Sequence, residues 1–188
     1  PGQRRDRSRS AGALQVMNEN TAVPDISVIM PALNEERRLA AAMANTLRAM
    51  DDCYLKGELI VINDGSRDRT PEIVREQASR DPRVRLIEHP APCGIGASFW
   101  DGVEAARGAA VVMLPGDNEN DPWEILRYYP MLTHVDIVIP FVFNKQARSL
   151  ARNALSFLYR FIINTTFLVN FNYTNGTYYY KVRAWTAV

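Results

Sequence analysis

Two carboxylates, Asp117 and Glu119, stand two residues apart in a short polar stretch of the chain. The stretch follows the β-branched run 111–113 and precedes a helix start at Asp121. We therefore expect both carboxylates in a loop at the carboxyl end of a buried strand, where open α/β sheets bind ligands. Carboxylate oxygens are preferred ligands of Mg²⁺ and Mn²⁺, which commonly connect protein carboxylates to substrate phosphates. Taken alone, the stretch also fits a solvated acidic turn in which Asp121 caps the next helix.

The elements that position these carboxylates alternate between strands and helices. Apolar, β-branched runs predict strands at 26–30, 58–62, 84–87, 109–114 and 135–139. The amphipathic segments between them predict helices, the first two with Asn34 and Thr70 as N-caps and a later one at 123–129 stopped by Pro130. The pattern indicates βαβ units and a mainly parallel α/β sheet. Because such crossovers are right-handed, the strand-end loops converge on one edge of the sheet. The converging loops are 31–35, 63–68, 92–96 and 115–119.

Two of the other loops carry residues suited to a nucleotide. Asp64 can accept hydrogen bonds from a base N–H or a ribose hydroxyl, although 63–68 also fits an ordinary Asx-type turn. Gly94 and Gly96 precede a helix and permit close approach of a phosphate, but small residues also serve helix–sheet packing. The third glycine and downstream acid of a dinucleotide fingerprint are missing, which disfavours a Rossmann oxidoreductase. We expect His89 to be structural.

Four ordered motifs over about residues 25–120 resemble inverting family-2 glycosyltransferases with the GT-A fold. The run 28–35 is similar to their opening strand and nucleotide loop, and 61–70 to their second signature, V-x-D-D-G-S-x-D-x-T. Residues 94–98 resemble the third motif, and Asp117-Asn118-Glu119 stands at the metal-binding D-x-D position. The resemblance implies a three-layer α/β fold with an open, mainly parallel sheet.

The resemblance also implies roles for individual residues. Asp117 and Glu119 would hold Mg²⁺ or Mn²⁺ on the diphosphate of a UDP- or GDP-sugar, and Asp64 would contact the base or ribose. The remaining donor-binding positions implied by the resemblance are Pro31, Ala32, Leu33, Asn34, Glu35, Asn63, Gly94 and Ala97. Three positions depart from the family pattern: Asn63 replaces a common Asp, Pro92 a usual Asn, and Glu119 the second Asp of D-x-D.

The second half of the chain contains an amphipathic segment at 148–169. Its polar residues recur every four positions beside a wide apolar face, which fits either a core helix or a helix at a membrane interface. This segment resembles the region after the catalytic core of polyprenyl-phosphate glycosyltransferases, such as dolichol-phosphate mannose synthases. Arg148 and Arg152 are the candidates for binding the acceptor phosphate, since guanidinium groups recognise phosphate well. Asn172 replaces an Asp of the family's following loop.

Composition and charge restrict the class of protein and its partners. The 188 residues carry a formal net charge of +1, and residues 1–16 supply four arginines against one aspartate. A basic field for nucleic acid is therefore absent. We expect a disordered arm or non-native remnant at 1–16, a nucleotide-sugar-binding core at 17–145 and an acceptor-side region at 146–188 that family members extend further. Without a signal-like segment, we expect a cytoplasmic protein or one peripheral to the cytoplasmic face of a membrane, with free thiols at both cysteines.

The leading hypothesis is metal-dependent, inverting transfer of a sugar from a nucleotide-diphosphate donor to a polyprenyl phosphate. A phosphate acceptor is already an anion, and this agrees with the lack of an obvious general base after Gly116. Two alternatives stay open: a glycosyltransferase acting on a saccharide or other soluble acceptor, and a non-catalytic nucleotide-sugar-binding module.

Overall fold

The computed structural model describes residues 23–138, 157–158, 161–162, 165–166 and 179–181. Within them, six strands form one sheet in the order β3-β2-β1-β4-β6-β5. The strands are β1 (Ile26–Ala32), β2 (Gly57–Asn63), β3 (Val84–Glu88), β4 (Ala110–Met113), β5 (Ile137–Val138) and β6 (Tyr179–Lys181). Strands β1 to β4 pair in parallel, whereas β6 is antiparallel to both of its neighbours. The prediction of a mainly parallel α/β sheet is confirmed.

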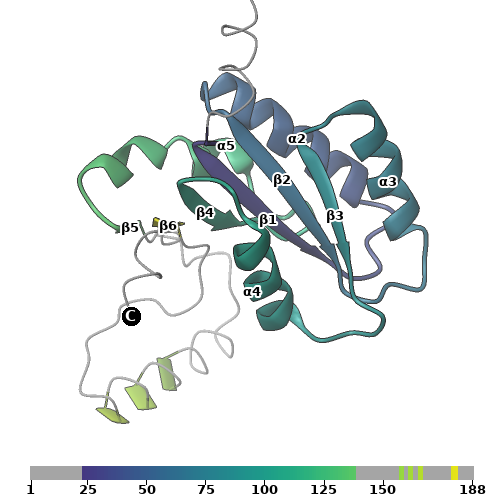
Figure 1. The fold of residues 1–188 in the computed structure, drawn as a ribbon. Coiled ribbons are helices and arrows are strands. Elements are labelled where there is room, and N and C mark those ends of the chain that lie inside the picture. Colours follow the sequence, from purple (N-terminus) through teal and green to yellow (C-terminus); the bar gives the residue numbers. More distant parts are fainter. Residues whose placement is uncertain (1–22, 139–156, 159–160, 163–164, 167–178, 182–188) are drawn as a thin grey trace, which may run out of the picture.

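Helices cover both faces of this sheet and give the three layers (Figure 1). The helices are α2 (Leu39–Asp52), α3 (Thr70–Arg80), α4 (Ile95–Ala105), α5 (Pro122–Leu126) and the 3-10 helix η1 (Tyr129–Thr133). In Figure 1, α2 and α3 lie on one face and α4 lies on the other. The alternating strands and helices of 26–113 therefore form successive crossovers, as the sequence predicts.

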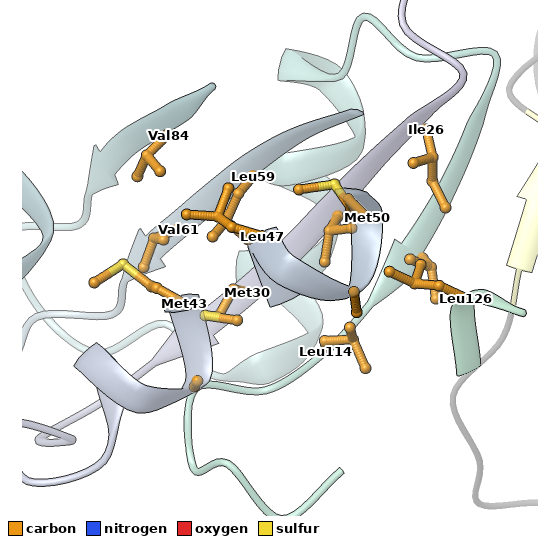
Figure 2. Close-up of a cluster of buried hydrophobic side chains, with 14 of the residues drawn as sticks. Ile26, Met30, Met43, Leu47, Met50, Leu59, Val61, Val84, Leu114 and Leu126 are labelled. Carbon is orange, nitrogen blue, oxygen red and sulfur yellow. The ribbon is translucent and has the colours of Figure 1, made fainter. Parts of the chain in front are cut away.

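The core is divided by the sheet into two apolar clusters. Val28 and Met30 of β1 belong to the larger cluster, which includes the apolar face of α2 (Figure 2). Ile29, between them in sequence, points to the other face and packs with Phe99 of α4. This is the period-two alternation of a strand whose two faces are both covered. Each such fully buried side chain contributes about 1.5–3 kcal/mol of transfer free energy.

Helix α4 approaches the sheet closely because residue 102 is glycine. A Cβ atom there would lie 2.4 Å from Cγ2 of Ile29 and 3.1 Å from Cδ1 of Ile62. Both isoleucines are fully buried, so neither can move aside without disturbing the core. This contact fixes how near α4 lies to β1 and β2.

The carboxyl ends of the parallel strands are aligned by their register. Ala32, the last residue of β1, pairs with Asn63 at the end of β2, and Asn63 pairs with Glu88 at the end of β3. Beyond β4, the N–H of Gly116 donates to the carbonyl of Pro31 over 2.9 Å, which keeps the next loop beside β1. The predicted convergence of the four loops on one edge is therefore confirmed.

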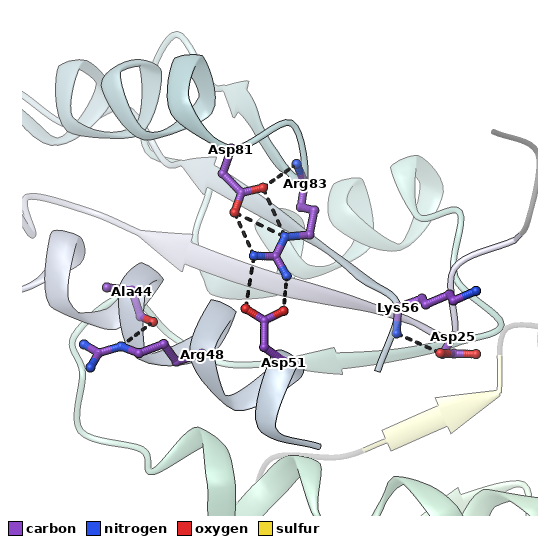
Figure 3. A network of polar contacts seen from close by, with 7 residues as sticks. All are labelled: Asp25, Ala44, Arg48, Asp51, Lys56, Asp81 and Arg83. Carbon is purple, nitrogen blue, oxygen red and sulfur yellow. Dashed lines mark hydrogen bonds and ion pairs between the residues drawn. The ribbon is translucent and has the colours of Figure 1, made fainter. Parts of the chain in front are cut away.

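A polar network anchors the C-terminal end of α2. Arg83, just before β3, donates to Asp81 and also pairs with Asp51 near the end of α2 (Figure 3). The hydrogen bonds from Arg83 hold the pKa of Asp81 below its ordinary value, although burial opposes this. The network ties the end of α2 to the turn that enters β3.

Several predicted boundaries differ from the structure. Strand β1 continues through Pro31 to Ala32, where a strand end was expected before Pro31. Pro130 does not simply stop a helix, because it lies within η1, which begins at Tyr129. Strand β6, between β4 and β5, has no counterpart in the predicted elements.

The amphipathic segment 148–169 lies largely outside the described residues, and so do Arg148 and Arg152. The pairs 157–158, 161–162 and 165–166 are described as helical and exposed. Across the described part of the chain, no helix combines the length and hydropathy needed to cross a bilayer.

Candidate functional site

The site is built on two loops that interlock at the carboxyl edge. The N–H of Asn34 donates to Oγ of Ser66 over 2.9 Å, and Oδ1 of Asn34 accepts from the N–H of Arg67 over 2.9 Å. Asn34 has a φ of 56°, a left-handed conformation that asparagine tolerates well. The expectation that Asn34 begins the next helix is wrong: α2 starts at Leu39.

A second set of hydrogen bonds joins the same two loops. The N–H of Glu35 donates to Oγ1 of Thr70 over 2.9 Å, and that of Glu36 donates to Oδ2 of Asp68 over 3.1 Å. Burial disfavours ionisation of Asp68, but hydrogen bonds from Thr70 and Glu36 outweigh it and lower the pKa of Asp68. Helix α3 starts at Thr70 as predicted, but Thr70 is not its N-cap: Arg69 holds that position and makes no side-chain capping bond. The Thr70 hydroxyl instead accepts from Glu35 in the neighbouring loop.

Asp64 connects the second loop to the third. Its side chain is 6% exposed, and its two oxygens accept from the N–H groups of Cys93 at 2.7 Å and Gly94 at 2.9 Å. Burial works against the charge of Asp64, yet these bonds and the contact with His89 lower its pKa. An ionised carboxylate has about four acceptor sites. The three contacts therefore leave room for one more donor, such as a ligand N–H or hydroxyl.

His89 lies beside Asp64, a contact that the sequence does not predict. Its Nδ1 lies 2.8 Å from Oδ1 of Asp64, and its Nε2 lies 2.8 Å from Oδ2 of Asp101 in α4. The bond to Asp64 raises the pKa of His89 despite burial, and Asp101 raises it further. The expectation of a structural histidine agrees with this position.

Asp64, His89 and Cys93 also present potential metal-ligating atoms within 4.8 Å of one another. The atoms of Asp64 and His89 are already hydrogen-bonded to each other, and Sγ of Cys93 contacts the carbonyl of Ala91 at 3.3 Å. Cys93 and Cys53 are both free thiols, as expected. This group works in the structure as a hydrogen-bonded connection between loops.

The acidic loop after β4 lies beside these loops. Asp117 is half-buried, and its Oδ1 accepts from the N–H of Glu119 over 3.0 Å. The Glu119 side chain is exposed and pairs with Arg38 over 3.8 Å. Asp121 caps α5 by accepting from the N–H groups of Trp123 and Glu124, as the sequence predicts.

The donor atoms of this loop suit a hard divalent cation. Asp117 and Glu119 offer carboxylate oxygens in a solvent-accessible loop, which matches the oxygen coordination of Mg²⁺ and Mn²⁺. Both ions usually keep open positions for water or phosphate, so two protein carboxylates are a sufficient set. Only Arg38 competes for Glu119 among the ion pairs of the described residues.

The other residues singled out from the sequence lie around the same edge. Pro31, Ala32 and Asn63 are buried at the strand ends, with Oδ1 of Asn63 accepting from the N–H of Ser66 in an Asx-type turn. Leu33 and Gly94 are exposed, and Glu35 and Ala97 are half-buried. The structure thus places the predicted donor-side positions on the strand ends, loops and helix start of this edge. The structure also brings Asp101 next to His89 and Arg38 next to Glu119. No motif in the sequence predicts either residue.

Parallel strands that deliver an Asp loop, a glycine-bearing helix start and a carboxylate pair to one edge define a GT-A type of nucleotide-sugar fold. The model of the family "Glycosyl transferase family 2" matches residues 27–185, and the chain belongs to that family.

Curated relatives match between about a half and three fifths of this chain. It is 35% identical over 108 residues to dolichyl-phosphate beta-glucosyltransferase ALG5A of Trichomonas vaginalis, covering 54% of this chain and 33% of the relative. It is 31% identical over 112 residues to an undecaprenyl-phosphate 4-deoxy-4-formamido-L-arabinose transferase of Edwardsiella ictaluri, covering 59% and 34%. The chain therefore spans about a third of the length of these relatives.

Solved structures share the fold. Mannosyltransferase PcManGT from Pyrobaculum calidifontis, in complex with GDP-Man and Mn²⁺, has a TM-score of 0.52 and 25% identity, covering 62% of this chain and 35% of that one. Glucosyl-3-phosphoglycerate synthase from Mycobacterium tuberculosis, in complex with UDP, has a TM-score of 0.59 and 23% identity, covering 100% and 65%.

Proposed function

We propose that this chain contains the donor-binding core of a metal-dependent, inverting glycosyltransferase that transfers a sugar from a UDP- or GDP-sugar to a polyprenyl phosphate. The observation that carries the proposal is the position of Asp117 and Glu119. Their loop lies beside the loops of Asp64 and Glu35, on the edge where open α/β sheets bind nucleotides. Relatives named for transfer to dolichyl or undecaprenyl phosphate support the acceptor class.

Different residues at this edge are proposed to bind different parts of the nucleotide-sugar donor. Asp64 has one acceptor site left for the base or ribose, and its N–H donates to the carbonyl of the strand-end residue Ala32 over 2.9 Å. Pro31 and Ala32 are proposed to line the pocket beside it. Asp117 and Glu119 would hold Mg²⁺ or Mn²⁺. When bound, this ion neutralises the charge of the leaving diphosphate. The Mn²⁺ complex of PcManGT with GDP-Man supports this choice of ion and donor class.

The acceptor oxygen attacks the anomeric carbon from the side opposite the leaving diphosphate, which inverts the configuration. An alcohol acceptor would need a general base to remove its proton. A polyprenyl phosphate is already an anion and needs none. Arg148 and Arg152 are proposed to bind that phosphate, and the exposed apolar pairs at 157–158 and 161–162 are consistent with a peripheral position at a membrane surface.

Donor binding is tested by thermal unfolding with UDP-glucose and GDP-mannose, with and without Mn²⁺. A specific donor at about 100 times its Kd stabilises the fold by about 2.7 kcal/mol. We expect this stabilisation for one base class only, to require Mn²⁺, and to disappear in Asp117→Asn. Asp121→Asn is the matched control, because asparagine still caps α5 and the residue lies in the same loop. Equal stabilisation of wild type and Asp117→Asn would overturn the site assignment.

The acceptor is tested with the selected donor by comparing transfer to a short polyprenyl phosphate with transfer to a saccharide. Transfer to the lipid phosphate, reduced in Arg148→Ala and Arg152→Ala, is the expected result. Transfer to the saccharide alone would contradict the acceptor class. Donor binding without transfer or hydrolysis would contradict the enzymatic role and leave a sugar-nucleotide-binding module.

A further inference from the structure

His89 faces a carboxylate on each side of its ring. Nδ1 lies 2.8 Å from Oδ1 of Asp64, and Nε2 lies 2.8 Å from Oδ2 of Asp101. Ionised carboxylates only accept hydrogen bonds, so each ring nitrogen has to donate, and this requires the imidazolium form. The His89 side chain is 9% exposed and that of Asp64 is 6% exposed, so water competes little for the contact between them.

This histidine connects three elements at the edge that holds the candidate site. His89 directly follows β3, and its N–H donates to the carbonyl of Asn63 at the end of β2 over 2.9 Å. Asp101 lies in α4, and Asp64 directly follows β2. The oxygen of Asp64 that receives His89 Nδ1 also accepts the N–H of Cys93, one residue before the Gly94 that precedes α4.

We propose that His89 is a positioning residue of the donor site: its imidazolium bridges Asp64 and Asp101 and so holds the loop 91–94 and the start of α4 where the nucleotide binds. This inference rests on the proposed function, because it assigns the bridge to that donor site. No feature of the family resemblance points to His89, and the geometry alone assigns it.

Loss of the ring proton has a defined consequence. A neutral imidazole donates through one nitrogen only, so one of the two carboxylates would face a lone pair at hydrogen-bond distance. The groups that face the ring among the described residues are Asp64 after β2, Asp101 in α4 and the Cys93 thiol in the intervening loop. Both carboxylates favour the protonated ring, so deprotonation releases one of these contacts.

The direction of the pH effect follows. The bond to Asp64 and the contact with Asp101 raise the pKa of His89, and, against the effect of burial, the bonds to Asp64 lower the pKa of that carboxyl, so their ion pair persists to a higher pH than a free histidine would allow. As pH rises through the raised pKa of His89, the bridge opens and donor affinity falls. We expect a decrease by a factor of about three to ten.

Two near-isosteric variants separate the two ends of the bridge. In His89→Asn the amide nitrogen stands near the position of Nδ1 and can still donate to Asp64. In His89→Gln it stands near Nε2 and can still donate to Asp101. Both variants are uncharged between about pH 6 and about pH 8.5. We expect His89→Asn to bind the donor more tightly than His89→Gln, and neither to keep the pH dependence of the wild type.

The experiment measures the Kd of UDP-glucose or GDP-mannose with Mn²⁺ by calorimetry, on the full chain, between about pH 6 and about pH 8.5. Wild type and the exposed His134→Asn should lose affinity together as pH rises, while His89→Asn stays flat. In parallel, ¹⁵N signals of the ring in His134→Asn, where His89 is the only histidine, should show a ring mostly protonated on both nitrogens at about pH 6.5, where a free histidine is half-protonated.

The outcomes separate the two proposals. Failure of wild type to bind either donor at any pH contradicts the proposed function and with it the positioning role. Donor binding with one pH profile shared by wild type, His89→Asn and His89→Gln overturns the role of His89 and leaves the proposed function standing. A His89 ring that titrates at or below the ordinary histidine pKa of about 6.5 also overturns it.

Discussion

At the scale of single residues, Gly65 shows how tightly the loops of the edge are packed. Its φ is 71°, and a Cβ atom there would lie 2.6 Å from the carbonyl carbon of Ala91 and 2.7 Å from the nitrogen of Pro92. Backbone cannot yield as a flexible side chain can. The glycine of the second motif is thus required by the neighbouring loop as well as by its own turn.

We expect Gly65→Ala to lower the free energy of unfolding by about 1–3 kcal/mol, through strain at a positive φ and displacement of the 91–94 loop. Donor affinity should fall with it. Urea unfolding gives the first quantity and calorimetry the second. Gly96→Ala is the control for stability, since no atom lies within 4 Å of its added Cβ and the residue is helical. Equal unfolding free energies in the two variants would show that the loops do not constrain position 65.

Arg38 is a competitor for the carboxylate pair. It contacts Glu119 over 3.8 Å, and both side chains are largely exposed. Removal of a nearby positive charge makes the loop more attractive to a divalent cation. In Arg38→Gln we expect the Kd for Mn²⁺ alone to fall by a factor of about two to five, measured by calorimetry without nucleotide. An unchanged Kd would mean that the ion pair does not restrain Glu119. The exposed Arg48→Gln serves as the control.

At the scale of elements, a buried network holds the amino-terminal side of the sheet, away from the candidate site. Oε1 of Glu58 in β2 accepts from Oγ of Ser27 at 2.7 Å and from the N–H of Arg107 at 2.7 Å, while Oε2 accepts from Arg85 at 2.9 Å. Glu58 is 6% exposed. One carboxylate therefore connects β1, β2, β3 and the turn between α4 and β4.

Loss of this carboxylate removes three hydrogen bonds and leaves the partly buried guanidinium of Arg85 without its ion-pair partner. We expect Glu58→Ala to cost about 3–5 kcal/mol in urea unfolding, and Glu58→Gln less, because its amide oxygen still accepts. Glu88→Ala on the neighbouring strand removes an exposed pair with Arg75 and should cost about 0–1 kcal/mol. Similar losses in Glu58→Ala and Glu88→Ala would contradict the structural role of the network. Donor affinity of the folded molecules should not change in either.

The same scale shows which elements a sequence can predict. The parallel strands β1 to β4 are predicted to within about two residues, because their apolar runs are bounded by turn residues. The start of α2 is missed for a specific reason. Asn34 has the side chain of a helix cap, but its Oδ1 accepts from Arg67 in another loop, 33 positions away. The type of residue at position 34 shows that its side chain can accept a hydrogen bond, but it does not show which N–H group will donate.

In the candidate site, too, the motif residues are predictable from the sequence and the contacts between loops are not. The position of Asp64 at a strand end is predictable from the motif, whereas its bonds to Cys93 and Gly94 depend on how two loops meet. His89 and Asp101 are ordinary polar residues in sequence and gain their meaning only from the 2.8 Å contacts at each ring nitrogen. The donor-side positions could therefore be predicted, and the residues that hold them in place could not.

At the scale of the whole molecule, the sheet contains one element that periodicity could not assign. The short strand β6 comes from residues 179–181 and inserts between β4 and β5, antiparallel to both. A βαβ pattern predicts parallel neighbours in chain order, and a three-residue strand distant in sequence gives too weak a signal to overrule it. The distal part of the chain thus completes the sheet beside β4, the strand that delivers the acidic loop.

The pH dependence of stability is the final property of the whole molecule. Lowered pKa values mark three carboxyls, Asp64, Asp68 and Asp81. Their contribution is complete above their ordinary pKa of about 3.9 and is lost as pH falls through the lowered values. His89 has the opposite sign: its contribution is complete below about 6.5 and is lost as pH rises through its raised pKa.

The free energy of unfolding should therefore be greatest between about pH 4 and about pH 6.5 and decline on both sides. Urea titrations from about pH 3 to about pH 8 test this, a range that stops below the ionisation of Tyr129, whose pKa burial raises. His89→Asn should flatten the alkaline side and leave the loss in acid, because the lowered carboxyl of Asp68 is untouched. If the alkaline decline persists in His89→Asn, another group causes it, and the bridge between Asp64 and Asp101 does not depend on the proton of His89.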